Sequence, residues 1–279
     1  MFGGRARQVL PSVRLGRSTL IWLTKKSAYK LFWGTGARTR YDHEIHGFNS
    51  ARACTVWGPH LLSLDQSSNP QLLRTTRGRA IAAGSAEDSG LFSFVEDRLR
   101  AAAQLNRTKP ALELIEIGKL MAGLSDSAMD SIIGRFSDRL HDLMLSAGPV
   151  HGDLHRGNLI EVDGRYFVID CDRFNPLSSP LFDRIHFSLT ERKLRRPLKW
   201  VELLSQSDDL VASAIEADGA VSGTPAQVAL AYGMNRLALE AFAARIDGRP
   251  RRKYREFALR LLDQYAGGPA HQAKWISSP

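Results

Sequence analysis

The first part of the chain consists of short apolar runs separated by turn residues. Short runs rich in β-branched and aromatic side chains predict β-strands. We expect strands at residues 13–15, 18–24, 28–33, 60–64 and 71–76, with a turn at residues 65–70 between the last two. Between the third and fourth strands, Tyr41–Asn49 has the spacing of a short helix. The pattern therefore predicts a small antiparallel sheet with one helix.

Beyond residue 78 the apolar positions recur at helical spacing. The expected helices are residues 91–105, 110–123, 126–146, 198–217, 225–245 and 251–264. One hairpin interrupts them, because apolar residues flank Asp163-Gly164, a dipeptide typical of a tight β-turn. We therefore expect an α+β protein with a strand-rich domain at residues 1–78 and a mostly helical domain at residues 79–279.

The composition is that of a globular protein, with 279 residues of which 43% are hydrophobic. No apolar run approaches the roughly 20 residues of a membrane-spanning helix. The two cysteines, Cys54 and Cys171, lie in unrelated segments, so a disulfide scaffold is not expected. These features predict a cytoplasmic protein, with contact at the inner membrane face as a further option.

The formal charge of +9 is concentrated near the start, where ten basic and two acidic side chains lie within the first 60 residues. A second basic run is Arg192–Lys199. Such charge favours anionic partners, namely nucleotide phosphates, an anionic substrate or a lipid surface. A solvated basic face is an equally weighted interpretation. Nucleic acid is not expected, because no stacking aromatic side chains interleave with the charges.

The most informative residues are His151–Asn158 and, after the hairpin, Asp170. The hairpin should bring Asp170 back beside Asn158. Phosphoryl transfer needs one carboxylate to orient the attacking hydroxyl and accept its proton, and an amide and a second carboxylate to hold Mg²⁺. Asp153 and Asn158 are five residues apart, the spacing of the Asp and Asn in a kinase catalytic loop.

Lys30 stands in an aliphatic strand, as the phosphate-binding lysine of kinases does. A buried ammonium keeps its charge only beside a carboxylate. We expect Glu44 of the following helix to be this partner, although Asp42 is close enough in sequence to compete. A surface lysine on a strand is the alternative.

Together these motifs resemble the aminoglycoside phosphotransferase and choline kinase group, small-molecule relatives of the protein kinases. The resemblance is carried by His151–Asn158, Ile169–Asp172 and Ser179–Asp183. It implies a bilobal protein-kinase-like fold, ATP or GTP as phosphate donor, Mg²⁺, and a hydroxyl as acceptor.

The resemblance also implies a role for each residue of the motifs. In the reaction, Asp153 would be the catalytic base, Asn158 and Asp170 the Mg²⁺ ligands, Lys30 (paired with Glu44) the phosphate anchor, and Gly16 with Ser18 the phosphate-binding turn. In support, His151 would hold the loop, His155 would approach the γ-phosphate or pack, Asp172 would assist the metal, and Asp183 would cap a helix start and hold the catalytic loop. The turn has a single glycine, Gly16, where kinases have G-x-G-x-x-G.

Other functions stay open at this point. A metal-dependent phosphoesterase would use His151, Asp153 and His155, but the sequence lacks the further Asp-x-His and Asn-His pairs of such a centre. A non-catalytic kinase-like scaffold is compatible with the poor glycine turn. Within the catalytic reading, the basic charge favours an anionic sugar or glycolipid acceptor over a polycationic aminoglycoside.

Overall fold

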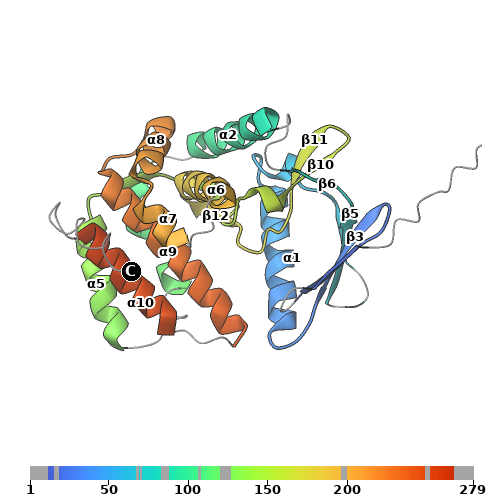
Figure 1. Cartoon of the computed structure of the whole chain (residues 1–279), viewed down its shortest axis with the longest axis horizontal. Helices are drawn as coiled ribbons and strands as arrows, with labels where there is room; N and C mark the ends of the chain where they lie inside the picture. The colour runs from blue at the N-terminus through green and yellow to red at the C-terminus, as the bar shows by residue number, and fades with distance from the viewer. Residues whose placement is uncertain are drawn as a thin grey trace, which may run out of the picture.

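The computed structural model describes residues 12–15, 19–66, 69, 71–82, 88–105, 108–119, 127–195, 200–248 and 252–266. They form a strand-rich N-terminal part beside a larger helical part (Figure 1). None of the helices described here is long and apolar enough to cross a membrane.

The N-terminal part is a five-stranded antiparallel sheet in the order β1-β2-β3-β5-β4. Its strands are β1 (Ser12–Leu15), β2 (Thr19–Leu23), β3 (Ser27–Phe32), β4 (Leu64–Gln66) and β5 (Leu72–Thr76). Helix α1 (Ala37–Ala53) stands between this sheet and the helical part (Figure 1). A small core of Phe32, Tyr41 and Leu73 joins α1 to the sheet. The predicted sheet with one helix is therefore confirmed.

Two boundaries in this part differ from the prediction. The expected strand at residues 60–64 is wrong, because Gly58–His60 forms a short 3₁₀ helix, η1, with Pro59 in its turn. Strand β4 begins only at Leu64 and includes Asp65 and Gln66, which were predicted to lie in a turn. Pairing with β5, which sets Leu64 opposite Thr75, decides this register, and no local pattern shows it.

A second, three-stranded sheet in the order β11-β10-β6 follows. Strand β6 (Arg79–Ala80) pairs with β10 (Leu159–Val162), which forms a hairpin with β11 (Arg165–Val168). Asp163 and Gly164 have φ values of 50° and 74°, as a type I′ turn requires. The predicted hairpin is confirmed, and it returns the chain to the start of β10.

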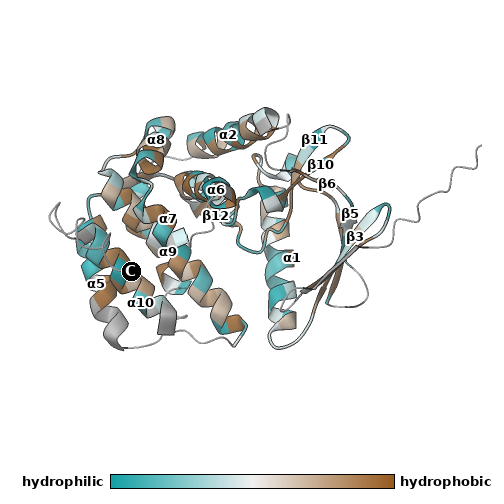
Figure 2. Ribbon diagram, viewed as in Figure 1, coloured by the Kyte–Doolittle hydropathy of each residue, from teal (hydrophilic) through white to brown (hydrophobic). Residues whose placement is uncertain are grey.

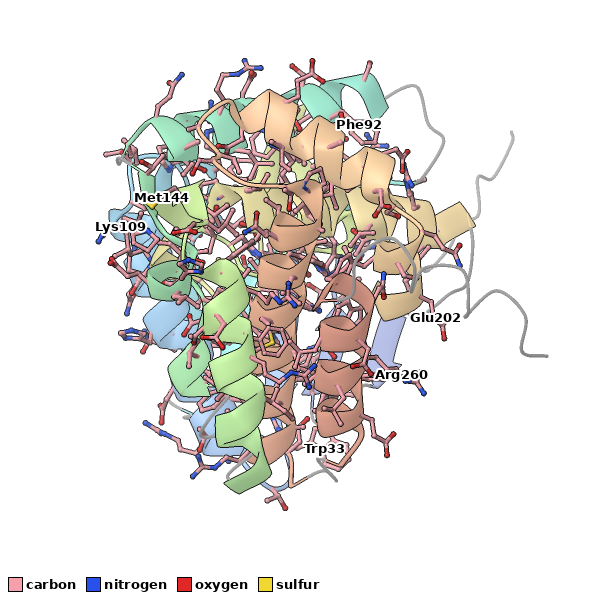
Figure 3. The ribbon with its side chains drawn as sticks, turned by 90° about the vertical axis from the view of Figure 1, so that its left-hand side faces the viewer. Trp33, Phe92, Lys109, Met144, Glu202 and Arg260 are labelled. Carbon is pink, nitrogen blue, oxygen red and sulfur yellow. The ribbon has the colours of Figure 1, made fainter. Side chains whose placement is uncertain are left out.

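The helical part is built around a long buried helix. Its helices are α2 (Asp88–Gln104), α3 (Ala111–Leu114), α5 (Ser127–Leu140), α6 (Pro180–Arg195), α7 (Trp200–Ser205), α8 (Asp208–Asp218), α9 (Pro225–Ile246) and α10 (Arg252–Ala266). A capping box between Thr224 and Gln227 starts α9, which contacts α5, α6, α7, α8 and α10. Figure 2 shows hydrophobic residues gathered where the helices face one another. Figure 3 shows α5, α9 and α10 side by side, with Arg260 pointing to solvent.

Three predicted helices have different limits. The helix expected at residues 126–146 ends at Leu140, and Met144–Ser146 form strand β8, which pairs with β7 (Thr108–Pro110). The helix expected at residues 110–123 is interrupted, since α3 ends at Leu114. The helix expected at residues 198–217 is split into α7 and α8 at Ser207. In the first case, apolar residues continue past the helix end and serve a strand instead.

Strand β9 (Gly148–Val150) pairs with β12 (Asn175–Ser178) and leads directly into the loop that begins at His151. This pairing sets the position of the predicted catalytic loop between the sheet β11-β10-β6 and the helices.

Candidate active site

A cleft of about 680 Å³ lies between the five-stranded sheet and the hairpin β10–β11. Its size is within the range of small-molecule sites. Most of its wall is apolar, with Ile21 and Ala28 from the sheet and Ile160 and Val168 from the hairpin. The crossing segment Arg77–Gly78 also lines it. The cleft therefore offers an apolar slot that could take a flat base.

Lys30 provides the charge at the polar end of this cleft. Strand β3 places Lys30 opposite Ile21 and Leu73 in the middle of the sheet. Its Nζ donates to Glu44 Oε2 at 2.8 Å and to Asp170 Oδ1 at 2.7 Å. The expected Lys30–Glu44 pair is present, whereas the competitor Asp42 pairs with Arg38.

The electrostatics keep this group charged. Burial by itself lowers the pKa of Lys30, but the carboxylates of Asp170 and Glu44 outweigh it, and the pKa lies above its ordinary value. Burial also acts to raise the pKa of Asp170, and the Lys30 ammonium overcomes it and lowers the value to about 2. For Glu44 burial prevails, and its pKa is raised. Asp170 is therefore the main counter-charge of Lys30.

A glycine in α1 allows this arrangement. A Cβ atom on Gly47 would lie 1.9 Å from the carbonyl oxygen of Cys171, so only glycine lets the helix backbone touch the loop after Asp170. Glu44, one turn earlier on α1, is thereby held beside Asp170. Gly47 was not among the sequence candidates, although a glycine inside a predicted helix is a signal of close packing.

An all-oxygen ligand set lies at the same end of the cleft. Glu44, Asp170 and Asp172 each offer an oxygen within 4.8 Å of the others. The amide nitrogen of Asn158 donates to the Asp153 carbonyl at 3.0 Å, which leaves its Oδ1 as a ligand. The backbone N–H of Ile169 donates to the Asn158 carbonyl and joins the two loops. Hard oxygen ligands of this kind suit Mg²⁺.

Buried hydrogen bonds hold the loop from His151 to Asn158. His151 Nδ1 accepts from the Asp153 N–H at 3.3 Å, so the proton is on Nε2, which donates to the Ile169 carbonyl at 2.9 Å. Asp183 accepts the backbone N–H groups of His151 and Gly152 at 2.6 and 3.0 Å. Burial raises the pKa of Asp183 to about 6. His151 and Asp183 thus both form hydrogen bonds within the loop or to it, and their supporting role in the reaction stays a prediction.

Asp153 has a surrounding that the sequence did not indicate. Its Oδ1 lies 2.7 Å from Arg236 Nη1, 3.2 Å from His186 Nε2 and 3.5 Å from Arg173 Nη1. Burial raises the pKa of Asp153, but Arg173 and Arg236 outweigh this effect, and the pKa lies well below its usual value. The carboxylate is therefore ionised and oriented through one of its oxygens.

Helices α6 and α9 supply these partners. His186 Nδ1 lies 2.9 Å from the Tyr232 hydroxyl, and Arg236 Nε donates to Glu240 at 3.1 Å. Burial lowers the pKa of His186 to about 3, so the ring is neutral. A signal was present in the sequence, because Arg236 and Glu240 are charged residues inside a helix that is otherwise almost entirely apolar.

The structure does not place the predicted phosphate-binding turn or the predicted basic run at the described cleft. Gly16 and Ser18 lie outside the described residues, and the phosphate-binding turn stays a prediction. Arg192 pairs with Asp209 at 2.5 Å in a second hollow between α2, α6 and α8, and among the described residues this hollow shares no lining residue with the cleft. Residues 196–199 of the same basic run lie outside the described part of the chain.

Comparison with known proteins decides the fold. No protein-family model and no curated protein matches the sequence. Choline kinase LicA from Streptococcus pneumoniae is 14% identical, with a TM-score of 0.56 over 91% of this chain and 93% of its own. This chain has the fold of a small-molecule kinase. The kinase-like fold is therefore confirmed as the predicted bilobal α+β class.

Two further structures share this kinase-like fold over most of their length. A thermostable mutant of aminoglycoside phosphotransferase APH(4)-Ia, bound to ADP and hygromycin B, is 12% identical, with a TM-score of 0.52 over 93% of this chain and 95% of that chain. The streptomycin–ATP complex of APH(2")-IIa is 13% identical, with a TM-score of 0.51 over 91% and 90%.

Proposed function

We propose that this protein is an ATP-dependent phosphotransferase that moves the γ-phosphate to a hydroxyl of a small molecule, sugar or glycolipid. The observation that carries the proposal is the contact of Lys30 with both Glu44 and Asp170 at the end of the cleft, with Asn158 beside them. These four side chains come from four separate parts of the chain, namely β3, α1, the loop that begins at His151 and the loop after β11. A shared fold with structures that contain ATP, ADP or AMP-PNP supports a nucleotide in this cleft.

Each of these residues has a defined task in the proposed reaction. Lys30 binds the phosphates of the donor, with its charge maintained by Glu44 and Asp170. Asn158 and Asp170 would hold Mg²⁺, which supplies charge neutralisation on the phosphates when bound. Asp153 accepts the hydrogen bond and then the proton of the acceptor hydroxyl. Its low pKa is no obstacle, since the proton leaves late and positioning contributes more than basicity.

The proposed acceptor is neutral or anionic. Arg173 and Arg236 both lie within 3.5 Å of the Asp153 carboxylate. Both guanidinium groups are paired with Asp153, and Arg236 also with Glu240, so they leave no net positive charge at the base. Support for the acceptor class is the formal charge of +9 of the whole chain, which favours anionic over polycationic ligands. This argument replaces the basic run at Arg192 as support for an anionic sugar or glycolipid, because Arg192 already pairs with Asp209.

A transfer screen tests the proposal directly. The full chain would be incubated with Mg²⁺ and γ-labelled ATP or GTP, and with sugars, sugar phosphates, uronic acids, lipopolysaccharide extract, choline and aminoglycosides. We expect labelled product from a neutral or anionic acceptor, and Asp153→Asn should abolish transfer while nucleotide binding persists. Nucleotide binding that does not need Mg²⁺, together with no transfer to any acceptor or to water, would instead identify a scaffold protein.

The charge series within this screen tests the acceptor class. Each sugar phosphate or uronic acid is compared with its neutral parent, and streptomycin represents the polycations. Faster transfer to the cationic compounds than to the neutral and anionic ones would contradict the proposed acceptor, while leaving the phosphotransferase activity established.

A further inference from the structure

The imidazole of His155 is folded back over its own loop in a fixed orientation. Its Nδ1 accepts the backbone N–H of Gly157 at 3.0 Å. A Cβ atom on Gly157 would lie 2.8 Å from the ring carbon Cε1 and 3.0 Å from Nδ1. The glycine is therefore what allows the ring to lie here, and His155 is positioned by its own loop.

This hydrogen bond also fixes which nitrogen carries the proton. A ring nitrogen that accepts a hydrogen bond has no hydrogen, so the single proton of the neutral ring is on Nε2. A doubly protonated ring could not accept at Nδ1, so this contact requires the neutral form. Nε2–H is thus a hydrogen-bond donor at the surface of the catalytic loop.

The donor lies across a gap from the open oxygen of Asp153. His155 Nε2 is 3.9 Å from Asp153 Oδ2, too far for a direct hydrogen bond. The other oxygen, Oδ1, is the one that contacts Arg236, His186 and Arg173. An oxygen atom at a hydrogen-bond distance of about 2.8 Å from both Nε2 and Oδ2 fits this separation. Such an oxygen lies to one side of the line that joins the two atoms, with Nε2–H as a donor to it and Oδ2 as an acceptor from it.

We propose that the gap between Asp153 Oδ2 and His155 Nε2 holds the acceptor hydroxyl, and that His155 is a catalytic residue which contacts the acceptor oxygen. This assignment rests on the proposed phosphotransferase function. The hydroxyl donates its hydrogen to Oδ2 and accepts from Nε2–H with one lone pair. Its second lone pair is free to point at the γ-phosphorus.

The step balances without any further reactant than the nucleoside triphosphate. The second lone pair of the acceptor oxygen forms the new O–P bond, and the bond from the γ-phosphorus to the oxygen bridging to the β-phosphate breaks. The electron pair of that bond leaves with the nucleoside diphosphate. The hydroxyl proton passes to Asp153 Oδ2, and the proton of His155 stays on Nε2.

The hydrogen bond that His155 donates to the attacking oxygen lowers the basicity of this oxygen, but that slows the reaction little. In a loose transition state the new O–P bond is weak, so the rate depends on where the oxygen lies more than on its basicity. Hydrogen bonds with two fixed groups, Asp153 and His155, define the position of the attacking oxygen. A displacement of this oxygen by about 1 Å can lower the rate about 100-fold.

The test compares three variants in two assays. The first assay is Mg²⁺-ATP hydrolysis, in which water takes the place of the acceptor hydroxyl. The second is phosphate transfer to the acceptor found in the screen. His155→Phe keeps a ring but removes the donor, and kcat should fall about 100-fold in both assays. The affinity for Mg²⁺-ADP, measured by calorimetry, should not change. His155→Gln retains an N–H donor and should recover part of the rate. His141→Phe, at a side chain that is 67% exposed, is the matched control.

A variant that displaces the His155 ring tests the inference independently. Gly157→Ala forces the His155 ring away and should reproduce the loss of kcat, and kcat is the readout for this variant because Gly157 also lines the nucleotide cleft. Long-range ¹⁵N NMR of the wild-type protein should show the His155 proton on Nε2.

The inference is overturned if His155→Phe turns over as fast as an active wild type, or if the proton is on Nδ1. A wild type that neither hydrolyses ATP nor transfers phosphate, and that matches Asp153→Asn, would instead refute the proposed function itself.

Discussion

The two oxygens of Asp153 have different surroundings, and this difference gives Arg236 a defined task. Arg236 donates to Oδ1 at 2.7 Å and to Glu240 at 3.1 Å, while only 13% of its side chain is exposed. Removing the charged partner of a buried carboxylate leaves that carboxylate less compensated, which is strongly destabilising. Arg236 therefore both stabilises the fold and holds the open oxygen of Asp153 in place.

Arg236→Met tests both tasks. We expect the free energy of unfolding to fall by about 3 kcal/mol, because Asp153 and Glu240 each lose a charged hydrogen-bond donor, and we expect ATP hydrolysis to slow because the base is less well oriented. Urea unfolding and a phosphate-release assay measure the two effects. Glu240→Gln is the control, since it touches Arg236 and not Asp153 and should lose much less activity. Wild-type turnover by a folded Arg236→Met protein would contradict the anchoring task.

Among the elements, helix α1 depends on one close approach. Gly47→Ala would place a Cβ atom 1.9 Å from the Cys171 carbonyl oxygen, so the helix must move away from the loop that carries Asp170. Glu44 would leave Lys30 and Asp170, and we expect weaker Mg²⁺-ATP binding by at least about 10-fold, which corresponds to about 1.4 kcal/mol. Calorimetric titration with a non-hydrolysed ATP analogue measures the affinity.

Gly134→Ala in α5 is the matched control for this change. A Cβ atom on Gly134 has nothing within 4 Å, and alanine is the better helix former by up to about 1 kcal/mol. The control should bind nucleotide as the wild type does and unfold at a slightly higher temperature. Equal nucleotide affinities for the two alanine variants would show that the approach of α1 to the loop is not needed.

The elements that the sequence predicts well are those with a local cause. Strands β2 and β3 follow from apolar runs between turns, and the hairpin at Asp163-Gly164 follows from its turn residues. The helix expected to reach residue 146 is wrong because strand β8 depends on pairing with distant segments, with Lys109 of β7 opposite Leu145 and a bridge from Met144 to Ser222. Pairing between distant segments leaves no trace in the local apolar pattern.

At the scale of the whole molecule, the site residues also divide into those with a local sequence signal and those that depend on contacts between distant segments. The motif from His151 to Asn158 and its companion Asp170 lie close together in sequence and could be recognised from spacing alone. Arg236 reaches Asp153 across 83 positions, and this contact depends on how α9 packs against the loop. The contact of Lys30 with Asp170, 140 positions apart, was not predicted, because the sequence analysis paired Lys30 with Glu44 only.

A second connection joins the N-terminal part to the helical part, besides the chain crossing at Arg77–Gly78. The start of α1 lies against the end of α9, where a Cβ atom on Gly36 would be 2.5 Å from the Ile246 carbonyl oxygen. Arg40 of α1 forms an ion pair with Asp247, and both side chains are largely buried. This contact fixes α1, and with it Glu44, relative to the helices.

Arg40→Met should separate these two parts. Asp247 loses an ion-pair partner, and the carbonyls of Trp33 and Thr35 lose their donor, so we expect the free energy of unfolding to fall by about 3 kcal/mol. Hydrogen exchange at the start of α1 should become faster. Arg38→Met is the control on the same helix, because the Arg38–Asp42 pair is exposed and contributes only about 0.3 kcal/mol. If both variants lose the same stability and show the same exchange in α1, the contact with α9 does not hold the two parts together.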